Sequence, residues 1–497
     1  MSGLKSLAKD TAIYGMSSIV GRFLNYLLVP LYTAKMSAAS GGYGIVTNIY
    51  AMTALLLVIL TYGMETGFFR YVNKKDCNPD TVYSTVIISV GTTSLLFTLL
   101  CYIFLGDISS LLGYAEHPEY IMMMACVVAM DAFQNIPFAY LRHKKKALKF
   151  AAIKFVFIIP NILLNLFFFI ACPYLLKHYP GTVDWFYSPS YGVGYVFVAN
   201  LICTGLQMLC LMPELTGFKY RFDMQLLRSM LKYSFPILIL GIAGILNQTV
   251  DKIIFRFVYP DSTTANAQLG IYGATSKIAM IMAMLTQAFR YAYEPFVFGK
   301  NKDKDNKETY AKAMKFFIIF TLLAYLGVMC YIDILKYIIQ PDYWEGLRVI
   351  PIVMAAEIFM GINFNLSFWY KLTDNTKWGA YLSIIGCIVI ISLNIIFVPK
   401  YGYMACAWAG FFGYLTIMLL SYFIGQKKYP IDYDLGGITM YALLAVILLE
   451  IRRAAHTGTL WIDFLTGTLL IAVFIVYIVK KDFPLKDIPI INRLIKK

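Results

Sequence analysis

Apolar blocks of about 20 residues recur along most of this chain. A helix of that length crosses the roughly 30 Å hydrocarbon core of a bilayer and satisfies its backbone hydrogen bonds internally. We count about fourteen such blocks, which leave no room for a large soluble domain. The sequence therefore predicts an all-α polytopic membrane protein with about 14 transmembrane helices.

The expected spans follow one another with few long loops. They cover residues 9–33, 43–66, 82–106, 119–141, 150–172, 192–212, 233–258, 269–297, 313–334, 348–370, 376–398, 403–425, 435–451 and 459–479. Segment 219–232, between the sixth and seventh spans, mixes basic and apolar residues. It predicts an amphipathic helix on the inner membrane surface, serving as a linker between two halves of the chain.

Composition excludes several classes of protein. Of the 497 residues 59% are hydrophobic and 14% charged, whereas soluble proteins are about 25% charged. A soluble enzyme, a disordered protein and a fibrous protein are therefore excluded. The nine Cys form no C-x-x-C pair, the four His have no ligand spacing, and no phosphate-binding loop or hydrolase motif occurs. We expect no metal, no cofactor and no enzymatic activity.

Basic residues are distributed very unevenly between the two sets of loops. Of the 43 Lys and Arg, 30 fall on the side that carries both termini, 7 on the opposite side and 6 inside spans. The positive-inside rule then places both termini in the cytoplasm and explains the net charge of +15 without a nucleic-acid partner. We expect a multi-pass membrane protein, surrounded by membrane lipids.

Charged residues inside spans are the first candidates for function, because each costs about 2.5–3.5 kcal/mol to insert. In the first span Tyr14, Ser18, Arg22 and Asn25 share one helical face. Arg22 is a candidate cationic contact for an anionic substrate in a central cavity. The alternative is a structural pair with Asp131 or Asp251.

The seventh span carries Asn247 and Asp251, and Lys252 and Arg256, each pair four residues apart. Asp251 either neutralises the two cations locally or faces a cavity and takes part in proton or cation coupling. In the second case Arg256 becomes a substrate contact.

The eighth span places Gln287, Arg290, Tyr291 and Glu294 on one stripe, with Lys277 on a different face. Arg forks and Tyr hydroxyls suit phosphate and sugar recognition, and Glu294 is a second coupling candidate. The alternative is an anchor at the membrane interface. In the fourth span Asp131, Gln134 and Asn135 predict contacts either to sugar hydroxyls or between helices, and Lys154 in the fifth span is similarly ambiguous.

Several stretches resemble those of polysaccharide flippases, and together they extend over the first twelve spans. They are Gly15-Met16-Ser17-Ser18 through Arg22, Pro30-Leu31-Tyr32, Tyr43-Gly44, Gly63–Arg70, Phe235-Pro236, Asn247, Val250-Asp251-Lys252, Gly270-Ile271-Tyr272, Asn394, Val398-Pro399, Tyr401-Gly402 and Ala405. A mild departure is Met404-Ala405-Cys406-Ala407, which stands where the family usually has Gly-Ala-Ala.

The resemblance is to the polysaccharide branch of the multidrug/oligosaccharidyl-lipid/polysaccharide (MOP) exporter superfamily. It implies two six-helix lobes around a central cavity, here residues 1–215 and 216–430, followed by two additional helices and a cytoplasmic tail in 431–497. It also implies a location in the bacterial inner membrane and transport of an undecaprenyl-pyrophosphate-linked oligosaccharide to the outer leaflet by alternating access, with polysaccharide polymerase machinery as a partner. The alternatives are a multidrug cation antiporter of the same superfamily and a membrane glycan polymerase.

Overall fold

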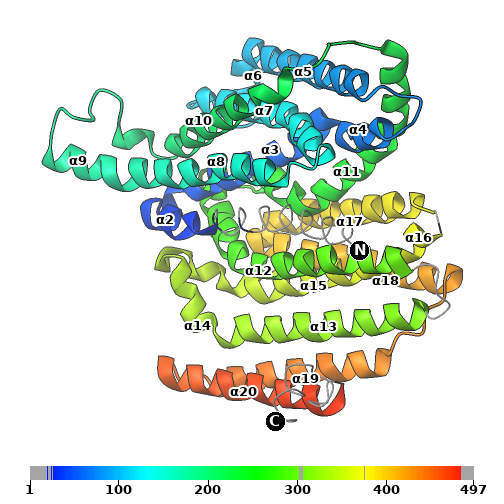
Figure 1. The fold of residues 1–497 in the computed structure, drawn as a ribbon. Helices are drawn as coiled ribbons and strands as arrows, with labels where there is room; N and C mark the ends of the chain where they lie inside the picture. The colour runs from blue at the N-terminus through cyan, green and yellow to red at the C-terminus, as the bar shows by residue number, and fades with distance from the viewer. Residues whose placement is uncertain (1–19, 21–23, 25, 301–305, 374, 483–497) are drawn as a thin grey trace, which may run out of the picture. The chain divides into compact units, whose positions relative to one another are not determined.

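The protein is described by a computed structural model over residues 20, 24, 26–300, 306–373 and 375–482, and these residues form helices and loops with no strand among them (Figure 1). The helices of the first half are α2 (Leu28–Lys35), α3 (Gly42–Thr61), α4 (Met64–Val72), α5 (Pro79–Ile103), α6 (Leu105–Leu111), α7 (Pro118–His143), α8 (Ala147–Leu166), α9 (Cys172–His178), α10 (Gly194–Leu211) and α11 (Met224–Val258). A π-helical turn, Phe167–Ala171, joins α8 to α9.

The second half is built in the same way. Its helices are α12 (Ser262–Lys300), α13 (Asn306–Cys330), α14 (Ile332–Leu335), α15 (Ile350–Leu366), α16 (Phe368–Leu372), α17 (Lys377–Tyr401), α18 (Tyr403–Lys428), α19 (Leu435–Ala454) and α20 (Leu460–Lys481). A 3₁₀ segment, Pro341–Val349, leads into α15.

Thirteen helical segments within the described residues are long and apolar enough to cross a membrane. They begin with Gly42–Val72 and end with Leu460–Lys481, and each overlaps one of the predicted spans from the second to the fourteenth. The first predicted span, 9–33, lies largely outside the described residues. The prediction of an all-α polytopic fold is therefore confirmed.

Segment 219–232 does not form a helix of its own, as the prediction of a linker helix there required. Residues from Met224 onward belong to α11, which continues without a break to Val258. The Asp223 side chain caps this helix by accepting hydrogen bonds from the backbone N–H groups of Gln225 and Leu226. Pro236 removes one backbone donor but does not end the helix.

The chain separates by packing into two compact units. The first comprises the described residues up to Ala274 together with Ser383–Cys406, and the second comprises Thr275–Leu382 and the described residues from Ala407 onward. Helices α12, α17 and α18 each contribute residues to both. The division into lobes at 215/216 and 430/431 stays a prediction.

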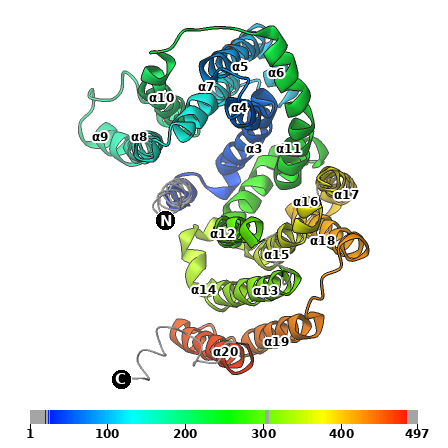
Figure 2. The same ribbon diagram turned by 45° about the vertical axis from the view of Figure 1, so that its right-hand side comes forward.

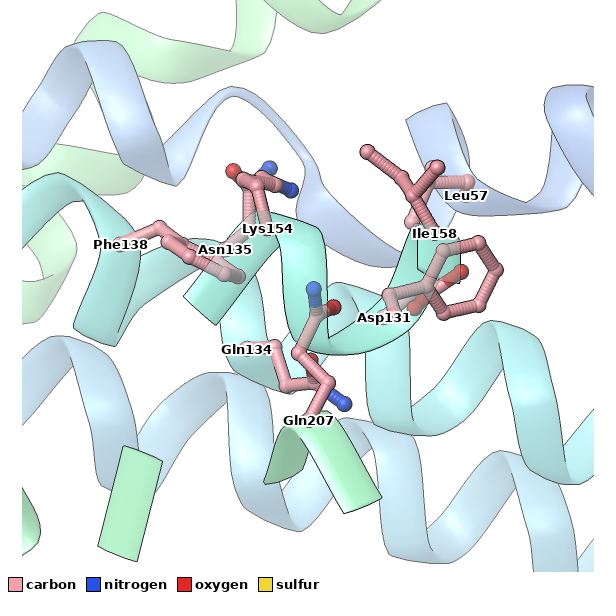
Figure 3. A pocket seen from close by; sticks show the side chains of 9 residues that line it. Leu57, Asp131, Gln134, Asn135, Phe138, Lys154, Ile158 and Gln207 are labelled. Carbon is pink, nitrogen blue, oxygen red and sulfur yellow. The ribbon is translucent and has the colours of Figure 1, made fainter. Parts of the chain in front are cut away.

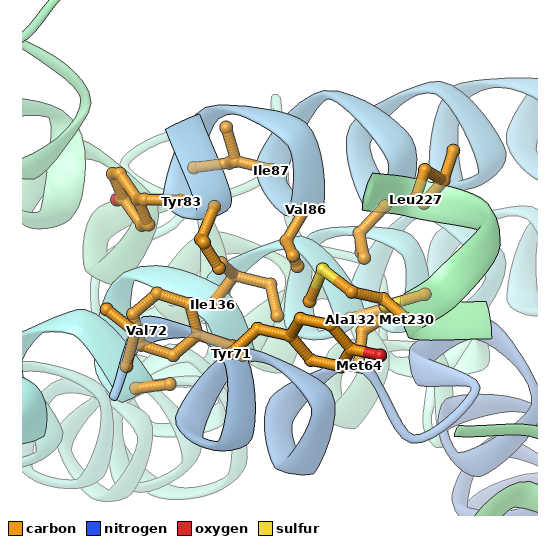
Figure 4. Packing of buried hydrophobic residues seen from close by; sticks show 14 of the residues in the cluster. Met64, Tyr71, Val72, Tyr83, Val86, Ile87, Ala132, Ile136, Leu227 and Met230 are labelled. Carbon is orange, nitrogen blue, oxygen red and sulfur yellow. The ribbon is translucent and has the colours of Figure 1, made fainter. Parts of the chain in front are cut away.

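In the first unit α5, α7, α4 and the start of α11 surround an apolar cluster (Figure 4). Met64, Val86 and Ile136 are fully buried in it, and Met230 joins it from α11. The hydroxyl of Tyr83 is buried with them and donates to the carbonyl oxygen of Glu214 at 3.0 Å. The cluster fixes the positions of α4 and α7 against the helices that follow in the chain.

In the second unit α13 packs against the hairpin formed by α19 and α20 (Figures 1 and 2). The contact is apolar in its middle, where Tyr441 and Phe474 are fully buried. At one end Lys315 pairs with Asp434 at 2.8 Å and with Asp482. At the other end Arg452 pairs with Asp333 at 2.8 Å. The two additional helices are thus fastened to the unit at both of their ends.

Glycines allow an unusually close approach between α3 and α12 in the first unit. A Cβ on Gly44 would overlap the backbone carbonyl oxygen of Asn266, and one on Gly270 would lie 3.0 Å from the backbone nitrogen of Gly44. Backbone atoms cannot move aside as a flexible side chain can. Close contact through small residues is a common way for membrane helices to associate.

Replacing Gly44 by Ala is expected to destabilise the protein, because α3 must move away from α12. Overpacking of this kind costs about 1–3 kcal/mol. The measurement is the thermal unfolding midpoint of the purified protein in detergent. Gly327→Ala in α13 is the matched control, since a Cβ there meets nothing within 4 Å. An unfolding midpoint for Gly44→Ala equal to that of the control would contradict the close-packing argument.

Candidate functional site

A cavity lined by both polar and apolar side chains lies among α3, α7, α8 and α10 of the first unit (Figure 3). Its volume is about 230 Å³. Its polar lining residues are Asp131, Gln134, Asn135, Lys154 and Gln207, and its apolar ones are Leu57, Phe138, Phe157 and Ile158. The helices that supply these side chains belong to the candidate membrane spans, so the cavity lies within the transmembrane part of the molecule.

Helical spacing explains how these residues meet. Asp131, Gln134, Asn135 and Phe138 are separated by three, one and three residues, so they share one face of α7. Lys154, Phe157 and Ile158 repeat that spacing on α8. Asp131 lies near the middle of the 26-residue helix α7.

Two glutamines hold the walls of the cavity together. The side-chain amide of Gln134 donates to the carbonyl oxygen of Thr204 on α10 at 3.0 Å. That of Gln207 donates to the carbonyl oxygen of Ile153 on α8 at 3.1 Å. Both glutamines are at least 96% buried, so these hydrogen bonds satisfy groups that would otherwise be costly in a membrane interior. The prediction of interhelical contacts in the fourth span is confirmed at Gln134.

The remaining polar groups of the cavity are less well satisfied. Within the described part of the chain, Asp131, Asn135 and Lys154 make no side-chain hydrogen bond, and Gln134 Oε1 has no partner. The Lys154 ammonium lies 4.0 Å from the centre of the Phe138 ring. A cation–π contact of this kind compensates part of its lost hydration.

Arg256, a predicted substrate contact, is engaged by the loop between α6 and α7. Its guanidinium donates to the carbonyl oxygens of Leu112 and Gly113, both at 3.0 Å. It also lies 4.3 Å from the centre of the Tyr114 ring. Gly113 has a φ of +74°, and a Cβ there would come within 2.7 Å of the guanidinium.

Tyr114 extends this contact to α3. Burial raises the pKa of the Tyr114 phenol to about 12, although the nearby Arg256 lowers it. The phenol therefore keeps its proton at neutral pH and donates it to Asn48 Oδ1 at 2.8 Å. Asn48 in turn donates to the backbone carbonyl of Lys252 at 2.6 Å. We call Asn48, Tyr114 and Arg256 the α3–α11 fastening.

Asp251, a predicted coupling residue, is also engaged. It accepts hydrogen bonds from the Tyr272 hydroxyl at 2.7 Å and from the Lys252 ammonium at 3.0 Å. One alternative predicted from the sequence is local neutralisation of Lys252 and Arg256 by Asp251, and the structure shows this pairing for Lys252. Arg256 uses backbone carbonyls instead.

The other predicted site residues are spread over the chain. Lys277 is half-buried on α12, and the exposed Arg290 has its guanidinium 4.9 Å from the centre of the Phe364 ring. Arg22 and Asn25 lie outside the described residues, as do the side chains of Tyr291 and Glu294. The structure brings Asp251, Lys252 and Tyr272 together, and separately Arg256 with the α6–α7 loop.

Sequence reasoning did not identify two parts of this arrangement. The contribution of Gln207 to the cavity and the engagement of Arg256 by residues 112–114 both depend on contacts between distant segments. The helical spacing of Lys154, Phe157 and Ile158 was a usable signal for the α8 wall. No local pattern indicates which carbonyl groups an arginine will bind.

Two protein families and one curated protein are similar in sequence to this chain. The family described as "Polysaccharide biosynthesis protein" matches residues 7–292, and the MatE family matches residues 236–396. "Lsg locus putative protein 1" of Haemophilus influenzae is 20% identical over 430 residues, which are 84% of this chain and 98% of that protein.

Solved structures share the fold. A structure titled "Lipid II flippase MurJ, inward closed conformation" has a TM-score of 0.73 at 18% identity, covering 94% of this chain and 98% of that one. An inward-facing multidrug resistance MATE family transporter of the MOP superfamily has a TM-score of 0.64 at 13% identity, covering 81% and 93%.

Replacing Arg256 by Met is expected to loosen the α6–α7 loop. Hydrogen bonds from a charged donor contribute roughly 1.5–3 kcal/mol, so the Gly113 and Tyr114 amides should exchange about tenfold faster or more. Hydrogen–deuterium exchange of the purified protein measures this. Arg453→Met is the control, because the Arg453 side chain is 82% exposed. Unchanged exchange in residues 112–116 would show that the fastening contributes nothing.

Proposed function

Because the chain belongs to the family of polysaccharide biosynthesis proteins, we propose that it is a flippase for a lipid-linked oligosaccharide. Its substrate is an oligosaccharide on undecaprenyl pyrophosphate, moved from the cytoplasmic to the outer leaflet for the synthesis of a surface polysaccharide. The observation that carries the proposal is the family match over residues 7–292, more than half of the chain. The all-helical MOP-type fold supports it.

The chemistry of such a substrate explains why the membrane helices need polar side chains. Sugars and a pyrophosphate lose their hydrogen bonds to water when they enter hydrocarbon, at a cost of several kcal/mol for each unsatisfied group. A path lined by fixed donors and cations removes most of this cost. We propose Arg22, Asn25, Arg256, Lys277, Arg290 and Tyr291 as substrate contacts, with the arginine forks holding the pyrophosphate.

The proposed orientation gives the α3–α11 fastening a role. With both termini in the cytoplasm of a bacterial cell, α11 runs outward, and Arg256 lies near its outer end. The fastening then joins α11, α3 and the α6–α7 loop at the outer face of the first unit. For Arg256 to contact the pyrophosphate, it must first leave the carbonyl oxygens of Leu112 and Gly113.

An ion gradient or the membrane potential would drive transport, with Asp251 and Glu294 as the coupling residues. Protonation or cation binding at Asp251 would compete with Lys252 and Tyr272, which both donate to this carboxylate. Removal of the product by polysaccharide polymerase machinery would pull transport in the same direction.

A multidrug cation antiporter is the second candidate, favoured by the match of the MatE family to residues 236–396. Such an antiporter requires an anionic binding surface. Efflux of a fluorescent organic cation from cells that express the protein separates the two functions. A flippase is expected to leave the intracellular level of the dye unchanged.

Deletion of the gene is expected to leave lipid-linked glycans on the cytoplasmic leaflet, and leaflet-resolved labelling of spheroplast membranes measures this. Complementation with Arg22→Ala or Arg290→Ala should restore export about tenfold less well than the wild type, since each removes a charged contact to the pyrophosphate. Arg453→Ala is the control, and membrane protein levels are compared by immunoblot. Normal leaflet distribution after deletion, or full export by both arginine variants, would refute the assignment.

A further inference from the structure

Several polar side chains of the cavity in the first unit lack hydrogen-bond partners, so helix packing alone does not account for them. Asn135 and Asp131 come from one face of α7, and Lys154 comes from α8 (Figure 3). In the described part of the chain none of the three has a hydrogen-bond partner, and the 98% buried Gln134 leaves its Oε1 unpaired. Polar side chains held at membrane depth without hydrogen-bond partners indicate contact with water or a polar ligand.

The charges of the cavity argue against an ion as that ligand. Asp131 would attract a cation, but Lys154 lines the same cavity and would repel it. An anion would be attracted by Lys154, the single cationic lining residue, but repelled by Asp131. A neutral ligand that both donates and accepts hydrogen bonds suits the lining better, since the Lys154 ammonium donates, the Asp131 carboxylate accepts and the Asn135 amide does both.

Size and apolar surface narrow the choice further. At about 230 Å³ the cavity is smaller than the roughly 300–1,000 Å³ of sites for drug-sized ligands. It can therefore take one sugar ring but not a whole oligosaccharide. Leu57, Phe157 and Ile158 supply an apolar wall, which matches the C–H face of a pyranose.

The geometry points to a carbohydrate subsite in this cavity, where Asp131, Asn135 and Lys154 hydrogen-bond the hydroxyl groups of one sugar residue. The inference rests on the proposed function and adds a site that recognises one sugar residue of the substrate. Gln134 and Gln207 act as positioning residues, because their hydrogen bonds to Thr204 and Ile153 hold the three helices that form the walls.

Binding of single sugars tests the inference without any transport. The protein is placed in lipid nanodiscs free of glycosidic detergent, and the probes are the methyl glycosides of glucose, galactose, N-acetylglucosamine and rhamnose. Saturation-transfer difference NMR, titrated for each probe, measures binding. The variants are Asn135→Ala and Asp131→Asn, which leave the Gln134 and Gln207 hydrogen bonds in place. Asn363→Ala on α15, outside the cavity, is the matched control, and unfolding midpoints verify that all variants fold.

We expect the wild type and Asn363→Ala to bind at least one probe. Asn135→Ala and Asp131→Asn should each weaken that binding about threefold to tenfold, because the first removes one hydrogen bond of roughly 0.5–1.5 kcal/mol and the second replaces a charged acceptor with a weaker neutral one. No binding of any probe to the wild type would overturn the inference and leave a water-filled cavity. Equal binding by both cavity variants would overturn it as well. The binding test does not measure flipping. The leaflet experiment can therefore refute the proposed function, and the binding test can refute the subsite, independently of each other.

Discussion

The constraint on which the rest of this structure depends is that polar groups within a membrane must be satisfied by the protein itself. Each unpaired charge at the bilayer centre costs about 2.5–3.5 kcal/mol on insertion scales. The protein meets this constraint in different ways. Arg256 binds two backbone carbonyls and an aromatic ring, Asp251 accepts from Tyr272 and Lys252, and Lys154 lies on the face of Phe138. The Arg256 contacts tie together segments 144 residues apart in sequence, whereas the other two link helices that follow each other in the chain.

The fold could be predicted from sequence because hydropathy acts locally. A block of about 20 apolar residues identifies a spanning helix whatever its neighbours are. The second to fourteenth spans were found in this way and agree with the thirteen candidate spans in the described residues. The error at 219–232 has a local cause. The polar composition of the segment suggested an independent helix, whereas the cap at Asp223 starts a single helix that continues through Pro236.

The site could be predicted only in part, because its geometry depends on contacts between helices. The i, i+3, i+4 spacing placed Asp131, Gln134 and Asn135 on one face, and the cavity confirms that they lie together. The same reasoning could not show that Gln207 completes the cavity, since its neighbours on α7 and α8 are more than fifty residues away in sequence. Arg256 illustrates a second difficulty. Arg256 follows Asp251 closely on the same helix, so the sequence predicts an ion pair between them. The partners of Arg256 are instead the carbonyl oxygens of a loop about 140 residues earlier.

Counts of charged residues are therefore a poor guide to what a membrane transporter carries. Away from their ends the predicted spans carry six basic and five acidic residues, a difference too small to choose between an anionic and a cationic substrate. The structure shows why the count is uninformative, since Lys252 is neutralised by Asp251 and Arg256 is held by backbone carbonyls. A residue contributes to selectivity only through the hydrogen-bonding and charge capacity that its neighbours leave unused. By that criterion Asp131, Asn135 and Lys154 contribute most to selectivity, because their hydrogen-bonding groups are unused. Their combined charge is zero, and their donors and acceptors favour a neutral, hydroxyl-rich ligand.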